Sequence, residues 1–186
     1  MPPVKLSTLA LVLGALISAL GAYGLTNPRN MSAVLRKFPR SLPWGFALTL
    51  LGTFWFVLNV RQESIADFEP MKPYLYALFI AVGVGTCIFV QDFLAVRGLA
   101  VVLLLIAKLM VDTGRPHLGQ TSWVLVNQTL AYVWVFFGIW LTVAPWRLRD
   151  WIQAGTASET RLRIPAAASL ALGLLMAVLG VTVFRS

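Results

Sequence analysis

The chain has 186 residues, a net charge of +8 and a mean hydropathy of +0.80; 59% of its residues are hydrophobic and only 12% are charged. A soluble domain carries about 25% charged residues, and one of about 150 residues buries only about 70% of its unfolded surface, so this composition excludes a water-soluble fold. The single cysteine, Cys87, excludes an internal disulfide and a multi-cysteine zinc site, and the single histidine, His117, excludes a haem held by two imidazoles. We therefore predict an all-α, multi-pass membrane protein.

Six apolar runs are long enough to cross a bilayer, which takes about 20 helical residues for roughly 30 Å of hydrocarbon. Their continuity favours helices over barrel strands, in which apolar and polar residues alternate. The first run follows a single lysine, Lys5, and is about twice as long as the apolar core of a signal peptide, so we expect it to be retained. The predicted spans are residues 6–25, 43–60, 74–90, 94–111, 122–144 and 164–184.

Two connections between these spans are informative. Residues 30–38 place apolar side chains at helical spacing beside Arg36 and Lys37, which is typical of a short helix lying on the membrane surface, although an ordinary loop fits the pattern equally well. The third and fourth spans are separated only by polar residues within 91–97. An unbroken helix over residues 74–111 would be about 57 Å long, too long for one crossing, so we expect a tight hairpin there. No linker or repeat divides the chain, and residues 1–186 are predicted to form a single membrane domain.

The distribution of lysine and arginine predicts an orientation. Nine of these cations fall in the 25–43 and 145–163 connections and the 91–97 turn, and six fall on the other side. The positive-inside rule then places these connections in the cytoplasm and both termini outside, and the short loops without disulfides favour the cell membrane of a bacterium, the inner membrane. The nine are Arg29, Arg36, Lys37, Arg40, Arg97, Arg147, Arg149, Arg161 and Arg163; the six are Lys5, Arg61, Lys72, Lys108, Arg115 and Arg185.

Interfacial aromatic residues support the predicted span ends. Indole and phenol rings prefer the head-group layer of a membrane because they are apolar with one polar tip. Five such residues lie at or just beyond a predicted end: Trp44, Tyr74, Trp123, Trp146 and Trp151.

Polar side chains inside the fourth span form the candidate ligand-binding site. Arg97 and Lys108 are eleven residues apart and therefore share nearly one face of a helix at about 100° per residue. Ionisable residues within spans are costly and justify a functional hypothesis, here the binding or conduction of an anion. The alternative is structural: Lys108 extends toward the interface, and the amides join helices for about 0.6 kcal/mol each. The candidate residues are Arg97, Lys108, Asp112, Arg115, Asn127 and Gln128.

The segment from Lys108 to Pro116 consists of a lysine, six further residues and Arg-Pro. This is similar to the first signature of the type 2 phosphatidic acid phosphatases, which are six-helix membrane enzymes. The resemblance covers nine residues. That family also uses a Pro-Ser-Gly-His element and a later Ser-Arg element with a second histidine, of which one histidine attacks phosphorus and the other acts as an acid. This chain has one histidine and no Pro-Ser-Gly-His, so catalysis of that kind is excluded by residue count.

Other signatures of catalysis or cofactor binding are absent from the sequence, including those of zinc proteases, serine hydrolases and phosphate-binding loops. Asp92 and Asp112 would lie about 30 Å apart on one helix and cannot act as a pair. We predict no catalytic residue, no metal and no cofactor. Small residues spaced for close helix packing do recur, and they either pack within the chain or dock another subunit: Ala15 and Ala19; Ala77, Ala81 and Gly85; Gly173, Ala177 and Gly180.

These patterns support three hypotheses for function. The first is a non-enzymatic membrane subunit or scaffold, which follows from the missing catalytic signatures and the small-residue faces. The second is a carrier of a small solute or ion that uses the polar stripe on the fourth span. The third is a lipid-active membrane enzyme with Arg115 and His117 at the outer surface. The expected partners are membrane lipids and either another protein or a second copy of the chain. The cations lie in separate clusters rather than on one face, which argues against nucleic acid.

Overall fold

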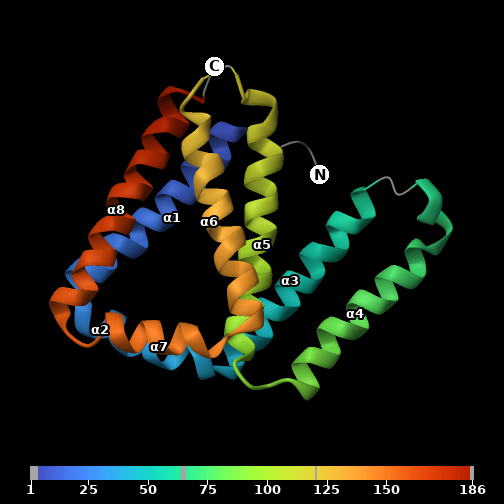
Figure 1. Cartoon of the computed structure of the whole chain (residues 1–186), viewed down its shortest axis with the longest axis horizontal. Coiled ribbons are helices and arrows are strands. Elements are labelled where there is room, and N and C mark those ends of the chain that lie inside the picture. Colours follow the sequence, from blue (N-terminus) through green and yellow to red (C-terminus); the bar gives the residue numbers. More distant parts are fainter. Residues whose placement is uncertain (1–3, 64–65, 120, 185–186) are drawn as a thin grey trace. The chain divides into compact units, whose positions relative to one another are not determined.

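The computed structural model describes residues 4–63, 66–119 and 121–184, and within them the chain is all-α (Figure 1). Six long helices are joined by two shorter α-helices and three 3₁₀ turns. The α-helices are α1 (Leu6–Thr26), α2 (Pro28–Lys37), α3 (Leu42–Gln62), α4 (Lys72–Phe89), α5 (Leu94–Gly114), α6 (Val124–Val143), α7 (Trp146–Gly155) and α8 (Glu159–Thr182). The 3₁₀ turns are η1 (Phe38–Arg40), η2 (Ala66–Met71) and η3 (Arg115–His117).

The six long helices, α1, α3, α4, α5, α6 and α8, are each apolar enough to span a membrane over 20 to 24 residues. The predicted fold class and the six predicted spans are therefore confirmed. The largest difference in bounds is at α8, which begins at Glu159 rather than residue 164. Ser158 caps its start, because the Ser158 side chain accepts a hydrogen bond of 3.2 Å from the backbone N–H of Arg161.

The connections differ more from expectation than the spans do. Residues 30–38, where a short helix or an ordinary loop was expected, are helical up to Lys37 as part of α2, which begins with Pro28, a position where proline costs no hydrogen bond. The predicted location of this helix on the membrane surface stays a prediction. The predicted hairpin between α4 and α5 turns at residues 90–93, where Phe93 has a φ of 54°, and Arg97 lies inside α5, as the predicted span 94–111 requires. The helix α7 was not predicted, although Leu148, Trp151 and Ile152 follow helical spacing among charged residues.

The chain forms two compact units, and α5 and α6 contribute to both. Unit 1 comprises Met1–Arg36, Ala107–Val133 and Arg149–Ser186. Unit 2 comprises Lys37–Ile106 and Trp134–Leu148.

In unit 1, α1 and α8 pack antiparallel with their backbones in contact, side by side in Figure 1. A Cβ atom on Gly14 would lie 2.5 Å from the backbone nitrogen of Ala177 and 2.7 Å from the carbonyl oxygen of Gly173. Such close approach requires small residues, and van der Waals contact is what drives helix association in lipid. The predicted strip on the last helix is therefore confirmed as a packing face. On the first helix, Ala15 and Ala19 are exposed and do not pack within the chain; Gly14 and Gly21 make the contact with α8 instead.

In unit 2, α3 packs parallel to the first half of α5. Gly45 lies against Leu94, and further along the same pair of helices Gly52 lies against Val101. Gly98 of α5 lies against Leu48 in the same interface. The starts of α3 and α5 therefore lie at the same end of unit 2.

The remaining elements of unit 2 pack on these two helices. On α6, Gly138 lies against Leu104 and Leu141 packs with Val96, which makes α6 antiparallel to α5. The helix α4 packs on α3, where the rings of Phe56 and Phe79 meet edge to face at 4.8 Å between centroids.

Candidate functional site

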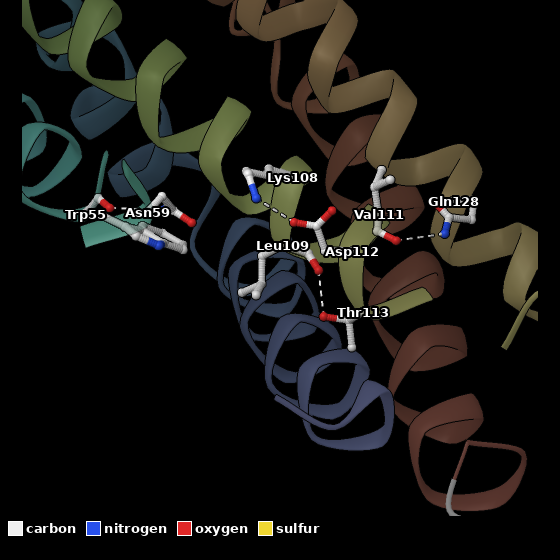
Figure 2. Close-up of polar contacts among 8 residues, drawn as sticks. All are labelled: Trp55, Asn59, Lys108, Leu109, Val111, Asp112, Thr113 and Gln128. Atoms are coloured by element: carbon white, nitrogen blue, oxygen red, sulfur yellow. Dashed lines mark hydrogen bonds and ion pairs between the residues drawn. The ribbon is translucent and has the colours of Figure 1, made fainter. Parts of the chain in front are cut away.

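Lys108 and Asp112 form an ion pair one helical turn apart on α5, with 2.6 Å between Nζ and Oδ2 (Figure 2). Their side chains are 43% and 47% exposed. Arg115, predicted to extend the same stripe, is exposed at the start of η3. Exposed pairs of this kind contribute little to stability, and Lys108 satisfies its charge locally.

Asn127 and Gln128 lie on α6 and are buried against α5. The Asn127 amide nitrogen donates to the carbonyl oxygen of Met110 at 3.1 Å, and that of Gln128 donates to the carbonyl oxygen of Val111 at 3.4 Å; Figure 2 shows the Gln128 contact. The opposite oxygen of each amide, Oδ1 of Asn127 and Oε1 of Gln128, is buried without a hydrogen-bond partner in the described chain. Two buried acceptors are thus available at this point of the α5–α6 contact.

Gly114 is the residue of α5 that lets the two amides approach so closely. A Cβ atom there would overlap with the amide nitrogen of Gln128 and lie 3.2 Å from that of Asn127. The amides therefore face the side of α5 that carries Met110 and Gly114, which is about 200° to 240° around the helix from Lys108 at roughly 100° per residue. The structure separates the predicted cluster into an exposed ion pair and a buried pair of amides.

Arg97, the sixth candidate, belongs to unit 2 and is half-buried on α5. Its Nε atom is buried and has no hydrogen-bond partner among the described residues. A guanidinium stays protonated in proteins, so Arg97 is a cation held inside a candidate membrane span without a protein acceptor at Nε.

Contacts between α2 and the α7–α8 turn were missed by sequence reasoning. Arg36 donates from Nε to the hydroxyl of Thr156 at 2.9 Å and from a terminal nitrogen to the Thr156 carbonyl at 2.7 Å. Arg29 forms an ion pair of 2.9 Å with Glu159, and the hydrogen bond and the negative charge of Glu159 raise the pKa of Arg29. The cationic connections are evident in the sequence, but no signal in it assigns these partners.

The described residues contain no group of three or more histidine, cysteine, aspartate or glutamate side chains that could hold a metal ion. No family model, curated protein or solved structure matches the chain. The nine-residue likeness to a phosphatase signature therefore carries no family assignment. The six spans and their packing define the class: a multi-pass helical membrane protein.

Proposed function

We propose that the protein is a non-enzymatic subunit or scaffold of the membrane, and that α4 is the helix that binds a partner. Within its span only 11% of residues are buried, against 50% in the span that contains α5. Ala77 and Ala81 are exposed on α4, and a Cβ atom on Gly85 would meet only the ring of Phe89 on the same helix, at 4.0 Å. This open strip on α4 is the observation that carries the proposal.

The comparison with α8 supports this role for the strip. Small residues at the same spacing on α8, including Gly173 and Ala177, pack against the backbone of α1. A helix of another subunit, or α4 of a second copy, can approach Ala81 in the same way, because no large side chain of that strip keeps the backbones apart.

Substitutions on α4 test the proposal in protein extracted with a mild detergent. Ala81→Leu places a large side chain on the strip and should release a co-purifying partner or convert a dimer into a monomer. Val82→Leu is the matched control, because Val82 is already a large residue and 57% exposed. A wild-type protein that runs as a monomer without a partner, or an Ala81→Leu variant that keeps its partner, contradicts the proposal.

The orientation predicted from the cations belongs to the same proposal: connections 25–43, 91–97 and 145–163 in the cytoplasm of a bacterial cell, with both termini outside. It is supported by the packing within unit 2, where the starts of α3 and α5 and the end of α6 lie together. Arg185, counted among the outer cations, lies outside the described residues. Two reporter enzymes fused after residue 186 test this orientation. A reporter that is active only outside the cytoplasm should be active there, whereas activity of a reporter that works only in the cytoplasm would contradict the orientation.

A second candidate function is a carrier for a small solute or ion. The unpartnered oxygens of Asn127 and Gln128 favour it, because buried acceptors within a span can coordinate a cation or a hydrogen-bond donor. Flux measured in proteoliposomes should fall in Asn127→Leu relative to wild type. Absence of flux for every cation and small polar solute tried rejects the carrier. No contact among the described residues favours a lipid-active enzyme at Arg115 and His117.

A further inference from the structure

Arg97 is the least satisfied charged group that lies within a candidate span. It is the fourth residue of α5, about 5 Å from the start of that helix at roughly 1.5 Å per residue. Its Nε atom is buried without a hydrogen-bond partner among the described residues, and an unpaired buried donor on a charged group is costly because it has lost its hydration. An acceptor from outside the chain would remove this cost.

The walls beside Arg97 come from two different helices of unit 2. The preceding residue, Val96, packs with Leu141 of α6, and the following residue, Gly98, lies against Leu48 and Thr49 of α3. Because neighbours in sequence point about 100° to either side, Arg97 lies between these two contacts, along the seam where α3 and α6 flank α5. The Arg97 side chain is only half-buried there, so part of its surface stays accessible from outside the unit.

A further polar atom in the same interface lacks a partner. The hydroxyl of Thr49 is buried without a hydrogen bond, and it faces Gly98, where a Cβ atom would lie 2.9 Å from it. The α3–α5 contact beside Arg97 therefore offers it no acceptor from the Thr49 hydroxyl, which faces Gly98.

The electrostatics at this end of unit 2 favour an anion. The parallel helices α3 and α5 both begin here, so the positive ends of two helix dipoles coincide. Arg40 and Arg147 are exposed beside the start of α3 and the start of α7. The nearest acid in sequence, Asp92, is exposed in the turn before α5, and Nε of Arg97 has no hydrogen-bond partner among the described residues.

The depth of Arg97 points to a lipid head group. Trp44 and Trp146, near the starts of α3 and α7, are 56% and 48% exposed, as expected of rings in the head-group layer. Basic pockets between membrane helices at this depth bind the phosphates of anionic lipids, and a planar guanidinium matches two phosphate oxygens at once.

We propose that the seam at Arg97 binds the phosphodiester of an anionic membrane lipid, with Arg97 as the ligand to phosphate. The site is formed by α3, α5 and α6 of unit 2, includes no residue of the exposed strip on α4, and does not depend on a protein partner.

Native mass spectrometry of the full chain with phosphatidylglycerol or phosphatidylcholine tests the site. Wild type should bind phosphatidylglycerol at least tenfold more tightly than phosphatidylcholine, and Arg97→Gln should lose that preference. Arg97→Lys keeps the positive charge but cannot bind two phosphate oxygens at once. Its preference for phosphatidylglycerol should therefore be weaker than that of wild type and stronger than that of Arg97→Gln. Lys108→Met is the matched control, since it removes one cation from the same face of α5, and it should keep the full preference.

Three outcomes overturn the proposal. The first is an equal preference in wild type and Arg97→Gln, and the second is an equal loss in Lys108→Met, which would show that net charge alone attracts the lipid. The third is thermal stabilisation by inorganic phosphate equal to that by phosphatidylglycerol, which would assign the site to a soluble anion. The affinity for phosphatidylglycerol is divided by the affinity for phosphatidylcholine within each variant, so a change in the basal stability of a variant does not affect this ratio.

Discussion

The contact between α1 and α8 predicts that a single methyl group at Gly14 destabilises the fold. In Gly14→Ala the new Cβ would lie 2.5 Å from the backbone nitrogen of Ala177, whereas ordinary contacts begin at 3.4 Å, so the two helices must separate by about 1 Å. Overpacking of a rigid contact costs up to about 3 kcal/mol, and the gain in helix propensity from glycine to alanine returns about 1 kcal/mol. The net loss is about 2 kcal/mol, which corresponds to a Tm lowered by about 4–8 °C.

The assay is the intrinsic fluorescence of the seven tryptophans during heating in mild detergent. Gly85→Ala is the control, because it makes the same chemical change on another span, where a Cβ atom meets only the Phe89 ring at 4.0 Å. Its Tm should stay unchanged or rise by a few degrees, about 2–4 °C per kcal/mol of propensity gained. If Gly14→Ala and Gly85→Ala unfold at the same temperature, the backbone contact between α1 and α8 is refuted.

Three further predictions concern other contacts. Arg36→Gln removes two hydrogen bonds to Thr156 and should lower the Tm by about 2–4 °C, the equivalent of about 1 kcal/mol. Arg29→Gln removes only an exposed ion pair and should leave the Tm unchanged. A larger loss of Tm in Arg29→Gln than in Arg36→Gln would contradict this ranking. Gly114→Ala should displace the two buried amides of α6 and lower the Tm with no loss of helix by circular dichroism. An unchanged Tm would show that these amides do not pack against Gly114 of α5. Cys87 is 4% exposed, so N-ethylmaleimide should add to it only after unfolding, as measured by intact mass; rapid labelling of the native protein would show that this face of α4 is open.

The membrane spans could be predicted because hydropathy acts over whole segments. A run of about 20 apolar residues is stable as a helix in the hydrocarbon of a bilayer, whatever the order of its side chains. The helix ends depend on single residues, and the cap at Ser158 extends α8 through Arg161 and Arg163, which hydropathy alone assigned to the connection. The helix α7 was missed because it is too short and too charged to register as a span.

The sequence indicates which residues of the candidate site are polar and which of them share a face of one helix. It does not indicate how neighbouring helices are rotated toward one another, so it cannot show which of these residues meet. Arg97 and Lys108 share a face of α5 by spacing alone. The side of α5 that receives Asn127 depends on how α6 is turned about its own axis, which its sequence does not specify. The same limit explains why Ala15 was chosen over Gly14 for packing: the two are adjacent, both are small, and only the partner helix distinguishes them.

The pairing of α1 with α8 also has a consequence for biosynthesis. Gly14 and Ala177 are in contact although most of the sequence lies between them. The glycine face of α1 therefore enters the bilayer long before α8 has been translated. At about 5–20 residues per second, that face waits roughly 8–30 s for its partner. During this interval a nascent chain exposes a surface suited to any small-residue helix nearby. A translation product that stops before α8 would keep that surface permanently, which makes it a natural target for membrane chaperones and proteases.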